Sequence, residues 1–427
     1  MFPNPQDALP LPPRPNLERY RKLAKELVKA ARSSDATAIH HWAAQWMRSL
    51  TRVTQSTPEI DRRTNHVEGF ARRQLSDRES TGGKGALTRA QFVIARLHGF
   101  ESWPKFVKHL EEFQRENSPV FRFEMAADAI VAGELPTLRR LLQEDPTLVH
   151  ATSTREHGAS LLHYVAANGV EDFRQETPPN IVEIAEALLA AGAEVDAAAH
   201  VYGGGCTALG LAATGIHPER AGVQNALLDK LLEHGAVLEQ PSIGGNRLPL
   251  LMACLSNGRL KAAEHLAGRG ARLNLPVAAA LGRLDLTRSF FQAGGGTPGP
   301  TAEEMTVGFL FACAGGRNRV IEFLLERGVP LTAQDSSGQT GLHWAAIGGH
   351  LDTVKLLLHR GAPLEVMNSY GGTVLGQALW SVANDGEKPD SIGILEALVD
   401  AGASLPNPCP PVNPRVDAWL SQHGRIT

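Results

Sequence analysis

The chain has 427 residues, 43% of them hydrophobic and 20% charged, with a formal net charge of −3 and a pI near 6.6. This length exceeds what one compact core usually holds and predicts several domains or a stacked array. The mild acidity disfavours nucleic acid and anionic membranes as partners, and no apolar run reaches the roughly 18 residues of a membrane span. We therefore expect a cytoplasmic protein, monomeric and without a membrane segment.

The first 117 residues differ in character from the rest. Six prolines fall among the first sixteen residues, without an apolar core, so we expect residues 1–15 to be disordered and not a secretory signal. Residues 16–117 are predicted to form an N-terminal helical region. It holds helices over 16–35 and 36–50, a polar stretch from Thr51 to Lys84 with few periodic apolar residues, and a helix pair from residue 87. Ser102 is predicted to cap the second helix of that pair, with Pro104 in its first turn.

A helix pair then recurs through residues 118–405. The stretch GQTGLHWAAIGGHLDTVKLLLHRGA, residues 338–362, contains a small-residue helix and a leucine-rich helix, and Gly349 and Gly361 lie twelve apart. The same spacing separates three other glycine pairs: Gly258 and Gly270, Gly282 and Gly294, and Gly316 and Gly328. Neither helix can bury its apolar side alone, and a glycine can end each second helix in a left-handed conformation. The pattern predicts an all-α solenoid of about eight helix-pair repeats.

Two kinds of irregularity interrupt this period. Three copies carry polar, turn-rich insertions between their helices, at residues 170–180, 216–222 and 381–390, which we expect to leave the stack as loops. Between Gly258 and Gly282 only 24 residues remain. A kink or tightened turn is therefore expected near residues 271–277. Residues 406–427 form a C-terminal capping segment, in which Val416, Trp419 and Leu420 predict a helix.

These residues resemble the ankyrin repeat, whose pattern runs T-P-L-H, A-A, G-H and, after an aliphatic helix, G-A-D-V-N. Residues 340–346, 349–350 and 361–362 match it closely, and 160–163 with 192–196 match it well. The resemblance covers about residues 122–405. Residues 90–110 are similar to a segment found ahead of ankyrin repeats in many bacterial proteins, which implies a bacterial origin.

The histidines favour structural roles. His163 and His343 occupy the repeat's own histidine position, where the resemblance implies a ring that bonds neighbouring backbone and fixes the hairpin. His40 and His41 are adjacent on a helix and so cannot both face one site. The sequence therefore predicts no metal site.

The cysteines are widely spaced, with no C-x-x-C pair, and fit a reducing compartment. Cys254 and Cys313 fall in the small-residue column of the first helices, where burial makes a thiol inert. Cys206 is more accessible but has no base near it in sequence, and Cys409 lies beyond the array. Since the chain also lacks phosphate-loop, G-x-S-x-G and H-E-x-x-H motifs, we predict no catalytic residue and no cofactor.

In ankyrin arrays, the hairpin tips and the exposed end of the first helix form the concave side, where partners bind. Carried over repeat by repeat, these positions predict a partner-binding surface made of Glu156, His157, Val201, Tyr202, Gln334, Ser336, Ser337, Gln339, Ile347, Met367, Tyr370 and Trp380. Aromatic residues at such a rim would anchor an interface. Tyr202 and Tyr370, at glycine-flanked tips, are expected to be exposed. Trp380 either lies at the rim or packs under the 381–390 insertion.

The resemblance implies a scaffold that recognises an unidentified protein partner and performs no chemistry of its own. The alternative is an enzyme or small-molecule-binding protein with a site in the groove under the three insertions. Loops on a rigid scaffold are where such sites are built, which keeps this alternative open.

Overall fold

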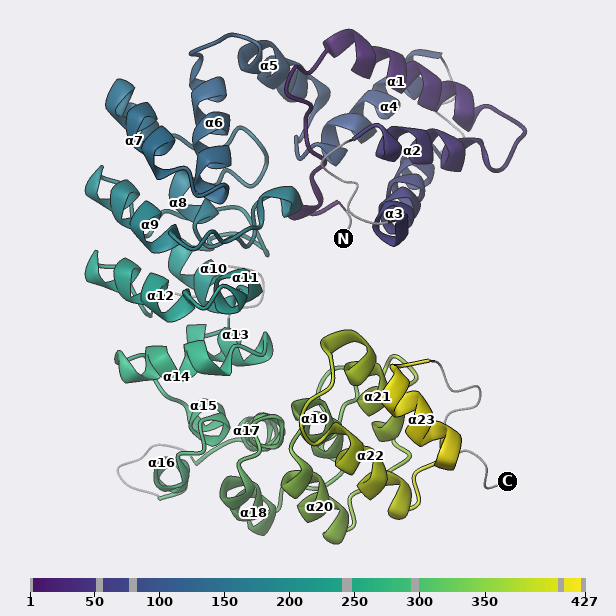
Figure 1. Ribbon diagram of the computed structural model, residues 1–427, viewed down its shortest axis with the longest axis vertical. Coiled ribbons are helices and arrows are strands. Elements are labelled where there is room, and N and C mark those ends of the chain that lie inside the picture. The colour runs from purple at the N-terminus through teal and green to yellow at the C-terminus, as the bar shows by residue number, and fades with distance from the viewer. Residues whose placement is uncertain are drawn as a thin grey trace. The chain divides into compact units, whose positions relative to one another are not determined.

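The computed structural model describes residues 3–50, 57–76, 83–239, 248–292, 299–405 and 411–423, and Cys409 and Gly294 lie outside these ranges. The chain divides into two compact units, residues 1–250 (unit 1) and 251–427 (unit 2). Throughout the described ranges the regular elements are helices, and β-structure is limited to three isolated bridges (Figure 1).

Unit 1 begins with the N-terminal helical region. Its helices are α1 (Leu17–Ala31), α2 (Ala38–Arg48), α3 (Thr57–Leu75), α4 (Gly83–Leu97) and α5 (Trp103–Phe113). Ser102 caps α5 as the sequence predicted, because its hydroxyl accepts from the backbone N–H of Lys105. The apolar sides of these helices share one core with Leu9, Trp46 and Phe106 among its members.

The polar stretch 51–84 contains a helix that the sequence reading missed. α3 buries Thr64, Val67 and Ala71 on one face, at the i, i+3 and i+7 positions of a helix. It packs against α2 and α4. The prediction failed because these few apolar residues are diluted by charged ones, although their spacing was helical.

The proline-rich N-terminus is likewise packed and not disordered over its described part. Ala8 and Leu9 are buried, and the backbone N–H of Leu9 donates to the carbonyl of Leu97 at 2.7 Å. The carbonyl of Leu9 in turn accepts from Nδ1 of the buried His98 at 2.9 Å. Two apolar residues between the prolines therefore hold this segment, residues 3–16, against the helical region. We call it the N-terminal strap.

The repeats of unit 1 follow as two columns of helices. The first helices are α6 (Pro119–Val131), α8 (Leu161–Tyr164) and α10 (Ala208–Thr214), and the second helices are α7 (Leu135–Glu144), α9 (Ile181–Ala190) and α12 (Gln224–Glu233). Within each column, every helix contacts the corresponding helix of the next repeat. The repeat pattern therefore produces the predicted stack.

Unit 2 continues the pattern. Its first helices are α13 (Leu250–Ser256), α15 (Leu275–Ala280), α17 (Ala302–Ala314), α19 (Gly341–Gly348) and α21 (Val374–Asp385); its second helices are α14 (Leu260–Gly268), α16 (Leu284–Ser289), α18 (Asn318–Glu326), α20 (Leu351–His359) and α22 (Ser391–Asp400). α13 begins at the boundary of the units. α23 (Pro414–His423) follows, and its buried Val416 and Trp419 join the core of unit 2. Together the described residues of both units hold eight helix pairs, as predicted.

The connections between successive helix pairs agree in part with what the sequence predicts. Isolated bridges close hairpins at Thr152–Ser160, Ala199–Cys206 and Gln334–Thr340. The shortened repeat lacks such a bridge: residues 269–274 lead directly into α15, and Asn274 caps it by accepting from the N–H of Val277 at 3.0 Å. The repeat therefore lacks its hairpin, as its length of 24 residues indicated, whereas residues 271–274 form neither a turn nor a kinked helix.

The insertions are more regular than expected. Residues 216–220 form helix α11 (Ile216–Arg220), and 172–174 form a 3-10 turn. The third insertion starts later than predicted, because α21 continues to Asp385 and the Ser381 hydroxyl donates to its carboxylate at 3.0 Å. Only residues 386–390 leave the helix there.

Leu357→Ala should lower the free energy of unfolding of unit 2 by about 3 kcal/mol. The side chain is 1% exposed and belongs to the apolar core shared by successive repeats, so its removal leaves a cavity. Denaturant unfolding followed by the amide protection of α19 and α20 would measure the loss. The exposed Lys355→Ala on the same helix is the control, and equal stability of the two variants would refute the packing described here.

Candidate functional site

The candidate surface residues of unit 1 are largely unavailable to a partner. His157 is fully buried, with Nδ1 accepting from the N–H of Ala159 at 3.0 Å, and Val201 is 3% exposed. Both were predicted to bind a partner, and their burial removes them from any accessible surface. The ring of His157 lies against Tyr164 and 3.5 Å from Glu171, and Val201 lies beside Gly169, so residues of the repeats themselves enclose both side chains.

The other two candidates of unit 1 contact the chain's own N-terminus. The carboxylate of Glu156 forms an ion pair with Arg96, and its backbone N–H donates to the carbonyl of Gly99 at 2.8 Å. Tyr202 is 51% exposed, but its hydroxyl lies 2.6 Å from Oε1 of Gln6 in the strap. In unit 1, therefore, the N-terminal region already occupies the hairpin tips.

In the described part of unit 2, the hairpin tips before α19 and α21 carry exposed side chains. The hairpin before α19 is held by Asp335, whose carboxylate accepts from the N–H groups of Ser337 and Gln339 and from the indole N–H of Trp344. Gln334 and Ser336 project from it and are exposed. Ser337 is half-buried, and Gln339, predicted to bind a partner, is only 7% exposed because it leads into the buried start of α19.

The next hairpin repeats this design with an amide in place of the carboxylate. Oδ1 of Asn368 accepts from the N–H groups of Tyr370 and Gly372 at 3.0 and 2.9 Å. Met367 and Tyr370 on either side of it are 61% and 80% exposed. The turn thus fixes the backbone that carries these two large side chains, both of which are mostly exposed.

Trp380 extends this exposed area onto α21. Nδ2 of Asn368 donates to Oε1 of Gln377 at 3.0 Å, which links the tip to the helix. Residues three apart lie on the same face of a helix, so Trp380 shares the face of α21 that carries Gln377. The side chain of Trp380 is 56% exposed. It does not pack under the 381–390 insertion. The half-buried Ile347 occupies the equivalent position one period earlier, on α19.

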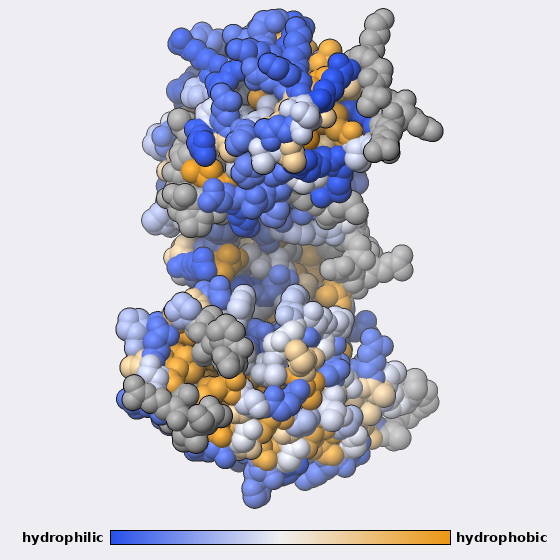
Figure 2. All heavy atoms as spheres, turned by 90° about the vertical axis from the view of Figure 1, so that its right-hand side faces the viewer, coloured by the Kyte–Doolittle hydropathy of each residue, from blue (hydrophilic) through white to orange (hydrophobic). Residues whose placement is uncertain are grey.

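Six of the predicted residues remain as a candidate site, and we call them the tip surface: Gln334, Ser336, Ile347, Met367, Tyr370 and Trp380. None of these side chains is charged. They come from two successive repeats whose first helices, α19 and α21, are in contact. Figure 2 shows one face of unit 2, on which hydrophobic side chains are interspersed with hydrophilic ones.

The repeat histidines His163 and His343 and the thiols of Cys206 and Cys254 lie in buried or hydrogen-bonded surroundings. Burial raises the pKa of Cys254 to about 12 and also raises that of Cys206, whose thiol donates to the carbonyl of Val201. No group of three His, Cys, Asp or Glu side chains suited to a metal ion occurs in the described ranges. His163 and His343 each accept from the backbone N–H three residues before them, as their position in the repeat implied.

The first insertion instead builds a buried ion cluster in unit 1. Arg155 contacts Glu124 and Glu171 at 2.6 and 2.7 Å, and Arg174 contacts the same two carboxylates at 2.8 and 3.3 Å. Burial alone would raise the pKa of Glu171, but the two guanidinium groups hold it well below its ordinary value. Such a carboxylate stays ionised and neutralised by arginine, which suits a structural role and not proton transfer.

Asp335, Asn368 and Gln377 support the tip surface and were not singled out in the sequence. A signal for them was present: Asp335 and Asn368 lie one 33-residue period apart, and both are residue types that stabilise turns by accepting from backbone N–H groups. The ion cluster had no comparable signal, because Glu124 and Arg155 are far in sequence from Glu171 and Arg174 and the four show no periodicity.

One comparison with known proteins identifies repeats in part of unit 2. Residues 309–358 and 342–381 match a family model described as ankyrin repeats in many copies. No curated protein matches the sequence. Among solved structures, the chain is similar to the crystal structure of the human ASB11 ankyrin repeat domain, with 21% sequence identity and a TM-score of 0.34. That match covers 66% of this chain and 99% of the ASB11 chain. The fold is an all-α solenoid of helix-pair repeats with an N-terminal helical extension, and residues 309–381 of it match ankyrin repeats. Within the part of the chain that is described, no helix is long and apolar enough to cross a membrane.

Proposed function

We propose that the protein recognises a protein partner through the tip surface of unit 2. Ankyrin repeats are known as a scaffold for protein–protein interaction. The observation that supports this site is the exposure of Met367, Tyr370 and Trp380 on backbone that turn hydrogen bonds already fix. Exposed aromatic side chains on a rigid frame lose little conformational entropy on binding, so they are suited to anchor an interface.

The chemistry of the tip surface defines the kind of partner. Because its side chains are apolar or uncharged polar, it fits a partner surface with an apolar centre and hydrogen-bonding groups around it. Binding should therefore depend little on salt concentration. As part of the same proposal, the protein is bacterial, cytoplasmic and monomeric. Its N-terminal helical region spans residues 16–117, its repeat array 118–405 and its C-terminal capping segment 406–427. The three described cysteines are free thiols, in keeping with a reducing compartment.

Replacing Tyr370 and Trp380 by serine together should weaken partner binding by about 3 kcal/mol, as expected for lost aromatic anchors. The fold should remain intact, since both side chains are mostly exposed. The partner would first be captured with the full chain as bait and identified by cross-linking and mass spectrometry. Calorimetry would then compare the two proteins.

The matched control carries Met125→Ser and Val237→Ser, two exposed apolar residues of unit 1. It should bind as the native chain does. If the control lost affinity and the Tyr370 and Trp380 variant kept it, the recognition site would have to be sought in unit 1.

A further inference from the structure

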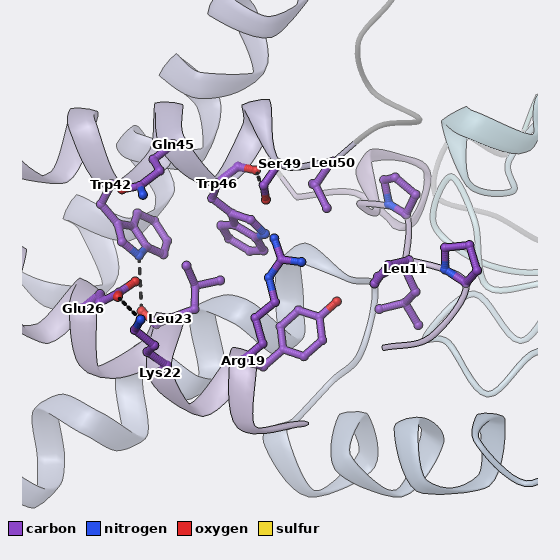
Figure 3. A pocket seen from close by; sticks show the side chains of 14 residues that line it. Leu11, Arg19, Lys22, Leu23, Glu26, Trp42, Gln45, Trp46, Ser49 and Leu50 are labelled. Atoms are coloured by element: carbon purple, nitrogen blue, oxygen red, sulfur yellow. Dashed lines mark hydrogen bonds and ion pairs between the residues drawn. The ribbon is translucent and has the colours of Figure 1, made fainter. Parts of the chain in front are cut away.

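The N-terminal region contains a cavity that the proposed partner recognition does not use. It lies between α1, α2 and residues 10–13 of the strap and has a volume of about 270 Å³ (Figure 3). All of its lining residues belong to the first fifty residues of the chain. The prolines of the strap form one wall because Leu9 fixes the strap immediately before them.

The apolar walls of the cavity are rigid. Trp42 and Trp46 both line it, with ring centroids 5.3 Å apart. The indole N–H of Trp42 donates to the carbonyl of Leu23 at 3.2 Å, and Trp46 packs against the ring of His98. Each ring is fixed by contacts behind it, and because Trp42 is 6% and Trp46 4% exposed, each offers only a small part of its ring to a ligand.

The charge at the cavity is positive. Lys22 is paired with Glu26 at 3.8 Å, so these two charges offset each other. Arg19 also lines the cavity and is exposed, and within the described residues its guanidinium forms no ion pair with a carboxylate. Figure 3 shows its side chain rising from α1 towards Trp46. The guanidinium group of Arg19 thus provides parallel N–H donors beside the tryptophan side chains that line the cavity.

We propose that this cavity binds a small aromatic carboxylate. The flat body of the ligand would contact the exposed parts of Trp42 and Trp46, and its carboxylate would accept two parallel hydrogen bonds from Arg19, a geometry that guanidinium and carboxylate share. In a mostly apolar cavity, a small number of polar groups is enough to fix the orientation of a ligand. The volume restricts the ligand to about two fused rings, at the lower end of ligand pockets.

The test uses 2-naphthoate and its uncharged analogue 2-naphthamide with the full-length protein. NMR would follow the indole N–H signals of Trp42 and Trp46, assigned with the Trp42→Phe and Trp46→Phe variants, and calorimetry would give the affinities. Naphthoate should shift both signals and bind at least about tenfold more tightly than naphthamide, because a charge-assisted pair with Arg19 is lost in the amide.

Arg19→Gln should weaken naphthoate binding about tenfold and remove the preference over naphthamide. Lys25→Gln, which removes a positive charge from an exposed position of the same helix, should change the affinity less than twofold. If millimolar naphthoate left both indole signals unmoved, or if Arg19→Gln and Lys25→Gln bound it equally well, the proposal would be wrong.

Discussion

Glu171→Gln should lower the free energy of unfolding of unit 1 by about 4 kcal/mol. The carboxylate is fully buried and contacts Arg155 and Arg174 at 2.7 and 3.3 Å. Removal of its charge leaves two buried guanidinium groups that Glu124 and the partly exposed Asp128 must neutralise alone. A buried charge that loses its partner keeps its desolvation cost without the compensating attraction.

Denaturant unfolding of both proteins, monitored in unit 1, would measure this loss. Asp172→Asn is the matched control, because Asp172 is the next residue and pairs with Arg63 at a partly exposed position. That ion pair should contribute less than about 1 kcal/mol. Equal losses in the two variants would show that the cluster does not stabilise unit 1 in the way its burial implies.

Acidification should destabilise unit 1 before its carboxylates begin to titrate. Burial lowers the pKa of His98 to about 3 and that of His109 to about 4. The folded-state values lie below the ordinary value of 6.5, so on acidification the unfolded chain takes up protons that the folded chain excludes. Stability is therefore greatest above about pH 6.5 and falls as the pH is lowered, by roughly 4 kcal/mol for the two residues together at about pH 5.

Measurement of the unfolding free energy as a function of pH would show this slope. His98→Phe should flatten it, since the new ring can stack on Phe106 as the imidazole does but cannot take up a proton. The exposed His41→Gln serves as the control and should keep the native slope. If His98→Phe and the native chain lost stability in parallel between about pH 6.5 and 5, protonation of His98 would not be the cause.

The periodic part of the fold was predictable from the sequence. The spacing of Gly349 and Gly361 recurs because each helix pair needs the same turn and the same contact with its neighbour. The spacing found in this one repeat could therefore be used to find the other repeats along the sequence. The absence of a hairpin before α15 was also predictable, because only 24 residues separate Gly258 from Gly282. These predictions succeeded because repeat contacts are local, joining residues one period apart.

The predictions that failed concern contacts between distant segments. Sequence position alone could not show that the strap and residues 96–99 contact the tips that carry His157 and Val201, because those tips match the repeat pattern as well as the tips before α19 and α21 do. The apolar residues of α3 were too few to dominate its charged sequence. For the candidate site, the pattern identified Met367, Tyr370 and Trp380, but exposure was decided by what the rest of the chain leaves uncovered.

The most direct test of partner recognition is site-specific photo-cross-linking from position 370. A benzoylphenylalanine replaces Tyr370 in the full-length protein, and the same group replaces the exposed Val237 of unit 1 in a second sample. After irradiation in a lysate of the native organism, one discrete protein adduct should form from position 370, disappear when Trp380→Ser is added, and be missing from position 237. Adducts that form equally from both positions, or from position 237 alone, would contradict recognition through the tip surface.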